Sequence, residues 1–561
     1  MPLRPKELKE GAARGHVRTL ASSCTHTGLH EMPREAGAGK AGRPLSAEDV
    51  GVLRAEFPGV SRLATAGVVL CDGAGGSQVH SSVAAAMQEQ LATRNFNVGA
   101  PFPGSEANLV AWTHARETLA AFLNCRAQEL VFGPSATALT FHMARSLARG
   151  HGAWRIGAGD NLVVTELDHA CNVGPWEMLA RETGAAIRRV RMQPSSWTLC
   201  QDSVRANIDE HTKLVAVGAA SNLIGSVHDL RGVVSHARAV GALSVVDAVH
   251  MAPHALLDVE AMGCDLLVCS PYKFFGPHLG VLFVRRTLAE ALEPCRVRPA
   301  SDELPTYEGC QGSRWELGTQ NYEGIAGAAA AVDYIASLAQ RFGGALNHRP
   351  GLGAEAAGVG VRDTGSDSAG DSAGGTNPQH QARVKRRQVR HQLSRSWELV
   401  QGHEAALSAR FLEGVSAMPH VRLLGKRRVV PAEVPGNAAG HLSPTATTQT
   451  RALPRAEDAG SRYWALLPTR TPTFAIRVRA SSGLSDLVPA AVADWLQRER
   501  GVWCASGNFY ALDLSESLNV EASGGVVRLG FLHYNTMQEV DRVLQALEDV
   551  SNARLPSSMP E

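Results

Sequence analysis

Between about Val69 and Arg285, short apolar runs alternate with segments of helical length, and this alternation constrains the fold more than any other feature. The candidate strands are Leu130–Phe132, Asn161–Thr165, Ile187–Met192, Leu214–Ala219, Leu243–Asp247, Leu266–Ser270 and Val281–Val284. β-rich runs spaced by helices predict a mostly parallel sheet with helices on both faces. We therefore expect an α/β fold built on a mostly parallel seven-stranded sheet.

The C-terminal part has a different pattern. Thr473–Arg479 has the composition of a strand, and Val526–Leu547 that of a strand, a turn at Asn535–Thr536 and an amphipathic helix. These patterns predict a smaller α+β domain over residues 396–561, next to a large α/β domain over residues 46–340. Residues 46–68 are expected to pack with the smaller domain.

Two stretches and the N-terminus do not have the composition of a packed core. Residues 341–395 and about 430–462 are rich in small and polar residues, which predicts low-complexity, disordered insertions. Residues 1–45 are basic with little apolar periodicity, which indicates a disordered or targeting extension. Glu7 and Glu10 count against a transit peptide, because such peptides are poor in acidic residues.

Charge, hydropathy and cysteine spacing exclude several classes of function. The net charge of +1 argues against a nucleic-acid partner. No apolar run reaches the roughly 18–20 residues needed to span a bilayer. The ten cysteines form no CxxC pair or zinc-type cluster, so we expect neither a metal site nor a disulfide scaffold. A reducing compartment, either the cytoplasm or an organelle, is favoured.

A carboxylate and an amine are predicted at the ends of two successive strands. Asp247 ends the run Leu243–Asp247, and Lys273 follows the run Leu266–Ser270. Ligands of parallel sheets bind beyond the carboxyl ends of the strands. There, a lysine forms an imine with the aldehyde of pyridoxal 5'-phosphate, and an aspartate keeps the ring nitrogen protonated. Taken singly, the aspartate could equally be a helix cap and the lysine a surface residue.

Further residue types suit the same cofactor. His169 follows a strand and can stack on a flat ring, and the turn Gly133–Leu139 enters a helix, where free N–H groups suit a phosphate. Each of these features also has an ordinary structural explanation. Candidate hydrogen-bonding groups around the phosphate and the ring are Ser135, Thr137, Ser270, Tyr272, His250 and Asn222.

Several stretches, in order along the chain, resemble a known family. They include ELDHACNVGPWEMLA, VVDAVHMAPH, SPYKFFGPHLGVLF, WELGTQNYEGIAG and VVRLGFLHYNT. The chain is similar to the class V aminotransferases, a family of fold type I pyridoxal-phosphate enzymes, and specifically to the cysteine desulfurase-like branch. The resemblance covers about Val69–Gln340 and Thr473–Leu547.

The resemblance implies a role for each matching residue. Lys273 would be the Schiff-base lysine, with Asp247 at the pyridine nitrogen and His169 stacked on the ring. Arg528 would bind the substrate carboxylate. Thr319 would reach the phosphate of the neighbouring subunit, which implies a homodimer. Residues implied near the ring hydroxyl are Asn222 and His250, and residues implied around the phosphate are Ala136, Thr137, Ser270 and Tyr272.

The sequence also departs from the desulfurase pattern. Cys504 is the only cysteine near the loop where desulfurases carry their nucleophile, and a gapless match anchored on Gly507 places Tyr510 there instead. Tyr272 and His250 stand where desulfurases have histidine and glutamine. Cys504 remains the candidate nucleophile, with an inert packed thiol as the alternative.

These features predict an enzyme that uses pyridoxal 5'-phosphate to act on a small amino acid bound as an imine. By resemblance, the first named activity is conversion of L-cysteine to L-alanine and enzyme-bound sulfur, with a possible sulfur acceptor protein. A C–C lyase, transaminase or epimerase without a thiol nucleophile is the alternative. A non-catalytic scaffold that binds partners through its insertions is a third reading.

Overall fold

The computed structural model describes residues 44–297, 314–343, 378–427, 463–464, 466–480 and 485–557. The extension expected over residues 1–45 and the insertion expected at about 430–462 lie almost entirely outside these ranges. Among the described residues, no helix is both long and apolar enough to cross a membrane.

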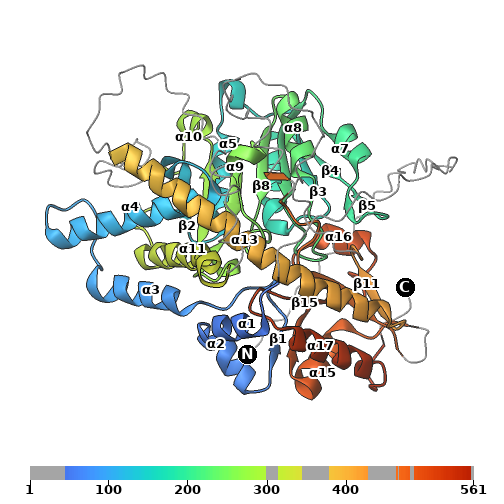
Figure 1. Cartoon of the computed structure of the whole chain (residues 1–561). Coiled ribbons are helices and arrows are strands. Elements are labelled where there is room, and N and C mark those ends of the chain that lie inside the picture. The colour runs from blue at the N-terminus through green and yellow to red at the C-terminus, as the bar shows by residue number, and fades with distance from the viewer. Residues whose placement is uncertain are drawn as a thin grey trace, which may run out of the picture. The chain divides into compact units, whose positions relative to one another are not determined.

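A seven-stranded sheet, the large sheet, has the strand order β2-β10-β9-β8-β7-β3-β4 (Figure 1). Its strands are β2 Leu130–Gly133, β3 Asn161–Thr165, β4 Ala186–Val190, β7 Thr212–Gly218, β8 Leu243–Asp247, β9 Leu266–Cys269 and β10 Gly280–Val284. Strand β10 runs antiparallel to its two neighbours, and the other adjacent pairs are parallel. The prediction of a mostly parallel seven-stranded sheet is therefore confirmed.

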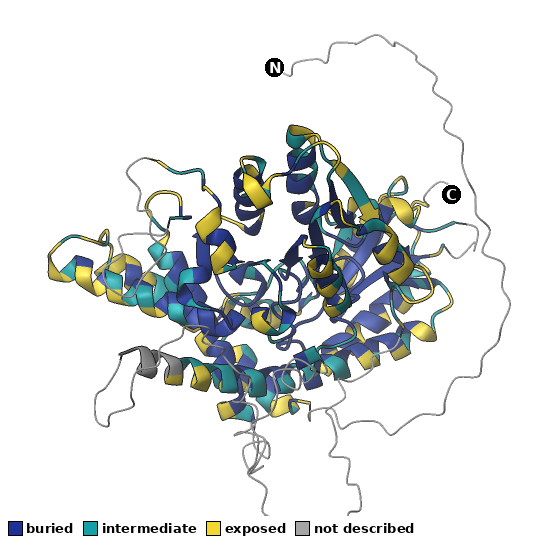
Figure 2. Cartoon of the chain, turned by 90° about the horizontal axis from the view of Figure 1, so that it is seen from above, coloured by how far each residue is buried: buried dark blue, intermediate teal, exposed yellow. Residues whose placement is uncertain are grey.

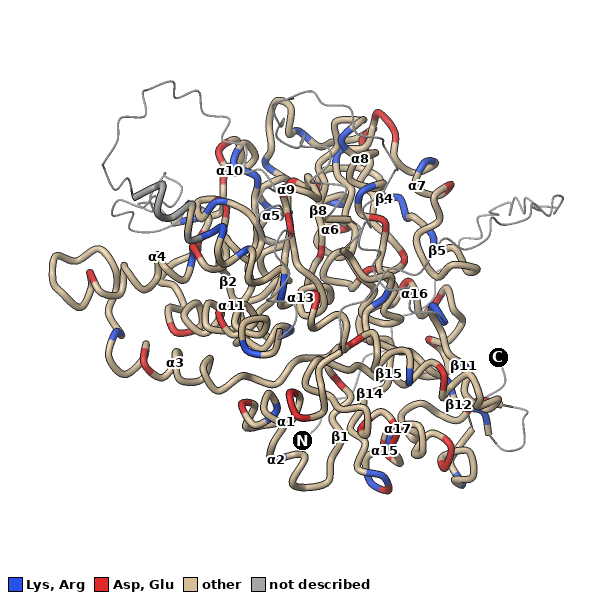
Figure 3. Tube along the Cα trace, in the orientation of Figure 1, with Lys and Arg blue, Asp and Glu red and all other residues tan. Residues whose placement is uncertain are grey.

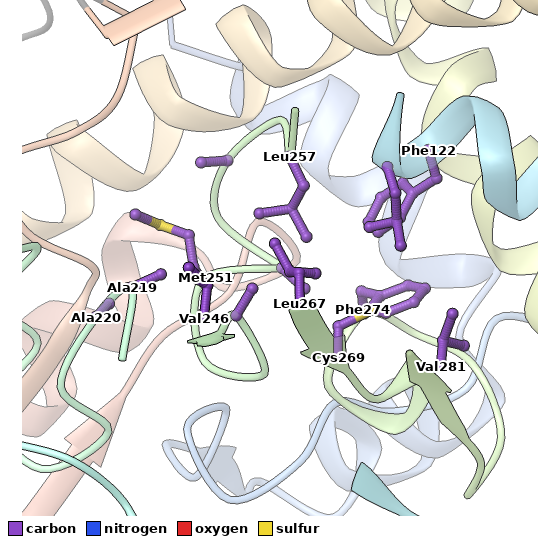
Figure 4. Close-up of a cluster of buried hydrophobic side chains, with 14 of the residues drawn as sticks. Phe122, Ala219, Ala220, Val246, Met251, Leu257, Leu267, Cys269, Phe274 and Val281 are labelled. Atoms are coloured by element: carbon purple, nitrogen blue, oxygen red, sulfur yellow. The ribbon is translucent and has the colours of Figure 1, made fainter. Parts of the chain in front are cut away.

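Alternate residues of each strand enter two apolar layers, because side chains on a strand point to opposite faces. In β8, for example, Val245 packs in one layer and Val246 in the other. The layer around Val246 also holds Leu267, Phe122 and Phe274 (Figure 4). Helices cover both layers, so the strands other than the edge strand β4 are mostly buried, and the exposed residues of the covering helices lie on their outer faces (Figure 2).

Helices α4 (Pro103–Leu123), α8 (Leu230–Ala239) and α11 (Tyr322–Phe342) contribute to the layer around Val246, and α5 (Ala136–Ala148) and α6 (Gly174–Thr183) to the other. The remaining described helices outside the C-terminal part are α1 Ala47–Ala55, α2 Pro58–Thr65, α3 Ser81–Thr93, α7 Gln201–Asn207, α9 Val259–Met262 and α10 Arg286–Ala291. Basic and acidic residues are interspersed over these elements (Figure 3).

One predicted strand is wrong in part. The candidate Ile187–Met192 divides into β4, which ends at Val190, and β5 (Met192–Gln193), which pairs with β6 (Thr198–Leu199) in a hairpin. Strand β4 lies at the edge of the large sheet and is mostly exposed. Because only one neighbour holds an edge strand, the chain is free to turn away after Val190.

A four-stranded antiparallel sheet, the small sheet, has the order β11-β12-β15-β14. Its strands are β11 Val421–Leu424, β12 Thr473–Val478, β14 Ala505–Gly507 and β15 Val526–Gly530, and its helices are α15 Pro489–Arg500, α16 Leu512–Ser517 and α17 Met537–Val550. Thr536 caps α17 in a capping box with Glu539. Arg54 of α1 binds Glu539 at 2.7 Å, and β1 (Val69–Leu70) pairs with β13 (Val502–Trp503).

Helix α13 (Pro378–Ser416) begins inside the range 341–395 that composition assigned to an insertion. It contacts α4 and α11 near the large sheet and α17 and β11 of the small sheet (Figure 1). Arg390 of α13 binds Asp258 at 2.9 Å, and Arg386 donates to the carbonyl of Cys125 at 2.7 Å. These two arginines of α13 therefore bind a carbonyl and a carboxylate of the large-sheet region.

Candidate active site

Asp247 and Lys273 lie on neighbouring parallel strands at the same sheet edge. Asp247 is the last residue of β8, and Lys273 ends a short 3₁₀ turn, Pro271–Lys273, that follows β9. Asp247 is paired in register with Val268 of β9. Both side chains are buried, with 7% and 8% of their residue surfaces exposed. The sheet thus brings the predicted carboxylate and amine to one edge.

The Lys273 amine is held by backbone carbonyls. Its Nζ donates to the carbonyl oxygens of Ala74 at 2.6 Å and Gly75 at 2.9 Å. Burial, reinforced by the positive charge of Arg528, lowers the pKa of Lys273 to about 8, whereas Asp72 and Asp247 act in the opposite direction. A substantial fraction of the amine is therefore neutral near physiological pH, and a neutral amine is a nucleophile.

The Asp247 carboxylate has weak partners for a buried charge. It accepts hydrogen bonds from the Cys171 thiol at 3.3 Å and from the Val249 amide at 2.9 Å. Across the described residues, it forms no ion pair. Burying a carboxylate without a cation is costly, so such a group is expected to meet a positive partner.

A second buried carboxyl group, that of Asp168, lies close enough to Asp247 to be affected by its charge. Burial, followed by repulsion from Asp247, raises the pKa of Asp168 to about 8. The Asp168 side chain accepts hydrogen bonds from the Gly218 amide and from Thr165. Asp168 is thus protonated over much of the neutral range.

His169 begins the 3₁₀ turn Ala170–Asn172 that follows β3, and its Nδ1 accepts the Cys171 amide at 3.0 Å. Burial lowers the pKa of His169, Lys273 and Arg528 lower it further, and Asp247 opposes them. The imidazole is therefore favoured in its neutral form. Its ring lies tilted against Tyr510, with the ring centroids 5.2 Å apart.

Arg528 on β15 brings the small sheet into the site. Its Nη2 donates to Oδ1 of Asp72 at 3.0 Å, and its Nη1 donates to the carbonyl of Asn222 at 3.2 Å. The guanidinium carbon lies 3.7 Å from the centroid of the Phe509 ring. The buried guanidinium group of Arg528 thus already holds one carboxylate of the chain. Bidentate binding of a carboxylate is the interaction that a guanidinium group suits best.

Asn222 and His250 are also buried at this edge. The Asn222 Nδ2 donates to the carbonyl of Phe509 at 2.8 Å, while its buried Oδ1 has no hydrogen-bond partner among the described residues. His250 Nε2 lies 3.1 Å from the Thr471 hydroxyl. Burial lowers the pKa of His250 well below its ordinary value, so the ring is neutral.

The predicted phosphate cradle is open at the N-terminus of α5. Ser135 caps the helix by accepting the Ala138 amide at 3.1 Å, and both Ser135 and Thr137 are exposed, while Ala136 is buried. The helix adjoins the His169 turn, because Thr140 donates to the carbonyl of Cys171 at 3.1 Å. A helix N-terminus with accessible N–H groups suits a phosphate.

Ser270 and Tyr272 lie on either side of Pro271, just before the lysine. Ser270 is buried, whereas the half-buried Tyr272 ring stacks on His278 with centroids 5.2 Å apart. The Lys273 Nζ lies 4.8 Å from the Tyr272 ring centroid. Thr319 is exposed in the loop before α11, and within the described chain no hydrogen bond joins it to this site.

Cys504 does not have the surroundings of a reactive thiol. It is half-buried between β13 and β14 and packs against the apolar core of the small sheet. Burial, with a contribution from Asp72, raises the pKa of Cys504 to about 12. Reactive cysteines lie in settings that lower the thiol pKa. Tyr510, not Cys504, contacts His169.

Sequence reasoning missed several residues of this site. Asp72, Cys171 and Asp168 contact or influence the predicted residues, yet each was only part of a quoted motif. Asp72 stands 456 positions from Arg528, its partner. Asp72, shortly after β1, and Asp168, in the turn after β3, are visible in the sequence as carboxylates that follow strands, but no spacing rule links Asp72 to an arginine on another sheet.

The comparisons with known proteins agree with this geometry. Residues 69–348 match the family model described as aminotransferase class-V. A cysteine desulfurase of Salmonella gallinarum is 34% identical over 234 residues, which cover 40% of this chain and 56% of the relative. One of Enterobacter sp. has the same identity and coverage. The chain thus matches about half the length of these relatives.

Solved structures show the same fold over most of the chain. The apo cysteine desulfurase of Thermococcus onnurineus matches with a TM-score of 0.63 and 21% identity, covering 91% of this chain and 100% of that one. The cysteine desulfurase CsdA of Escherichia coli matches with a TM-score of 0.60 and 19% identity, covering 90% and 98%. Through residues 69–348, which carry Lys273, Asp247 and His169, the chain belongs to the class-V aminotransferase family.

Proposed function

We propose that this protein is a pyridoxal-phosphate-dependent enzyme that acts on a small α-amino acid. One observation carries the proposal: Asp247 is a buried carboxylate without an ion-pair partner in the described residues, and the buried Lys273, on the adjacent strand connection, has its pKa lowered to about 8. A protonated pyridine nitrogen would supply the missing cation, and the cofactor aldehyde would take the neutral amine.

The other residues present fit the same cofactor. His169 would lie against the ring face, and the buried Oδ1 of Asn222, which has no partner, would accept a hydrogen bond from the ring hydroxyl or the substrate. The N-terminus of α5, with Ser270 and Tyr272, would hold the phosphate. When bound, pyridoxal 5'-phosphate stabilises negative charge that develops at the substrate Cα.

The side chains of this protein would then bind the amino acid and move its protons. Arg528 would exchange the Asp72 carboxylate, which it holds by one hydrogen bond, for the α-carboxylate of the substrate, because a guanidinium group can bind both oxygens of a carboxylate. Lys273 would take or return the proton at Cα, because its pKa of about 8 lies near the working pH. The neutral His169 would serve as a second proton carrier.

Removal of sulfur from L-cysteine, leaving L-alanine, is the first named reaction that we propose. It is supported by the relatives and solved structures described as cysteine desulfurases. The sulfur would pass to an enzyme thiol, with Cys504 as the candidate, and from there to an acceptor protein.

A second candidate function is a C–C lyase, transaminase or epimerase that uses the same residues without a thiol nucleophile. The observation that favours it is the state of Cys504, which is packed in an apolar core with its pKa raised to about 12.

Three measurements test the proposal in sequence. The purified protein mixed with pyridoxal 5'-phosphate is expected to gain a visible absorbance band that Lys273→Ala loses. Amino acids are then screened for their effect on that band. Sulfide or persulfide release from L-cysteine that Cys504→Ala abolishes supports the desulfurase. Amino-acid exchange with a keto acid, or turnover of a substrate without sulfur, supports the second candidate. A protein that stays colourless refutes both and favours the scaffold reading.

We also propose that the enzyme is a homodimer with shared sites. The phosphate cradle is open in one chain, with Ser135 and Thr137 exposed, and the family-matched Thr319 is exposed as well. Light scattering is expected to give twice the chain mass, and Thr319→Ala is expected to weaken cofactor binding without changing that mass. A monomer with full cofactor affinity contradicts the proposal.

A further inference from the structure

The loop between β14 and α16, residues 507–511, has an unusual backbone. Phe509 and Tyr510 are consecutive non-glycine residues in the left-handed region, with φ of 53° and 61°. L-residues rarely adopt this conformation, and it persists only where the surrounding structure fixes it. Such strain often marks a functional segment, so the contacts that hold the loop are informative.

Two hydrogen bonds attach the loop to the large-sheet side of the site. The Asn222 Nδ2 donates to the carbonyl of Phe509 at 2.8 Å, and the Ala170 amide donates to the carbonyl of Tyr510 at 2.7 Å. Ala170 directly follows His169. The loop therefore crosses from the small sheet to the turn that carries the candidate ring-stacking histidine.

Hydrogen bonds within the loop and with the residues that follow it also hold its conformation. Asn508 accepts the Tyr510 amide at 3.0 Å through Oδ1, and its Nδ2 donates to Glu521 at 2.9 Å. Ser515 of α16 donates to the other oxygen of Glu521. Asp513, in the first turn of α16, binds Arg189 of β4 at 2.8 Å. Opening the loop would break contacts on both sides.

The two strained residues contact the two groups between which an amino acid would lie. The Phe509 ring lies 3.7 Å from the guanidinium carbon of Arg528, and the Tyr510 ring lies 5.2 Å from the ring of His169. Tyr510 is 71% exposed, and no hydrogen bond of its hydroxyl occurs within the described chain. The backbone that carries this large side chain is thus held by hydrogen bonds, and the mostly exposed ring lies against His169.

We propose that Tyr510 closes the substrate side of this site and restricts it to amino acids with small side chains. The inference rests on the proposed function, and it adds a specificity-determining residue that acts through bulk. Because the loop is fixed on both sides, the ring occupies the space next to His169 before any substrate binds. A substrate side chain larger than that of alanine or cysteine would have to displace it.

The test compares Tyr510→Ala with the conservative Tyr510→Phe. Dissociation constants for L-alanine, L-cysteine and L-phenylalanine are measured from the absorbance change of the cofactor-loaded protein. We expect Tyr510→Ala to bind L-phenylalanine about tenfold or more tightly relative to L-alanine than the wild type does, since removing a steric block of several carbons has effects of this size. Tyr510→Phe should keep the wild-type ratio. An unchanged ratio in Tyr510→Ala overturns the inference.

A second measurement needs no cofactor. Amide hydrogen exchange of Ala170 in the apo-protein reports directly on its bond to the Tyr510 carbonyl. Glu521→Ala removes the hydrogen bond that holds the Asn508 side chain and is expected to speed exchange at Ala170 and Tyr510, whereas Glu516→Ala, at an exposed acid of the nearby helix α16, should not. Equal protection in both variants contradicts a braced loop. Failure of the wild type to take up the cofactor would instead refute the proposed function and leave this result standing.

Discussion

The lowered pKa of Lys273 makes a quantitative prediction about how the apo-protein captures its cofactor. Only the neutral amine attacks an aldehyde. With a pKa of about 8 instead of the ordinary 10.5, about one tenth of the amine is neutral at pH 7, compared with about one part in 3,000 for an ordinary lysine. Burial and the charge of Arg528 thus increase the reactive fraction about 300-fold.

The sign of the pH dependence follows. The protonated amine is disfavoured in the folded protein, so the neutral fraction rises as the pH rises through about 8 and changes little above it. Stopped-flow absorbance of apo-protein mixed with a low concentration of pyridoxal 5'-phosphate gives the second-order rate constant. We expect a nearly tenfold rise from pH 6 to pH 7 and a plateau above about pH 9.

Arg528→Met provides the internal comparison. It removes a positive charge that lowers the pKa of Lys273 and frees Asp72, which raises it, so the plateau is expected to move to higher pH. A wild-type rate that still climbs tenfold per pH unit above pH 9 would refute the reasoning, as would an Arg528→Met profile that coincides with the wild type.

Three further predictions concern stability, each measured by denaturant unfolding of the apo-protein. Arg116→Met leaves the buried Glu316 carboxylate unpaired, and a loss of about 3–5 kcal/mol is expected; a loss below about 1 kcal/mol would contradict it. Gly225→Ala forces a left-handed residue, at φ 72°, to place its Cβ against the carbonyl oxygen of Thr473, so a loss of at least about 1–3 kcal/mol is expected, and a neutral effect would be evidence against that close approach. The pKa of Asp168 is raised to about 8 in the folded protein, so the free energy of unfolding of the wild type is expected to fall as the pH rises from about 4 to 8. Asp168→Asn lacks this titrating group, so its free energy of unfolding should rise relative to that of the wild type over the same interval; parallel pH profiles of the two proteins would show that the carboxyl group is charged.

The sequence predicts well those parts of the site that strand order alone controls. Buried runs that end in Asp247 and shortly before Lys273 become adjacent parallel strands, and parallel strands bring their carboxyl ends to one edge. His169 is placed by the same rule, because β3 is a further parallel strand of that sheet. No contact between distant segments had to be guessed for these three residues.

What the sequence does not predict depends on contacts between distant segments. The Arg528–Asp72 pair joins β15 to the segment after β1, and the sequence contains no spacing that links them. The strained loop at Phe509 and Tyr510 is equally invisible, because aromatic residues have no intrinsic preference for positive φ. The first turns of α13 were misread because Arg386 and Arg390 resemble solvated charges until their acceptors on the large-sheet side are known.

The most direct test of the central claim is to locate the bond between protein and cofactor. The protein is incubated with pyridoxal 5'-phosphate, reduced with borohydride, digested and examined by peptide mass spectrometry. We predict a single stoichiometric adduct on Lys273 that Asp247→Ala weakens and Lys273→Ala abolishes. An adduct spread over other lysines such as the half-buried Lys213, with Lys273 unmodified, would contradict the account.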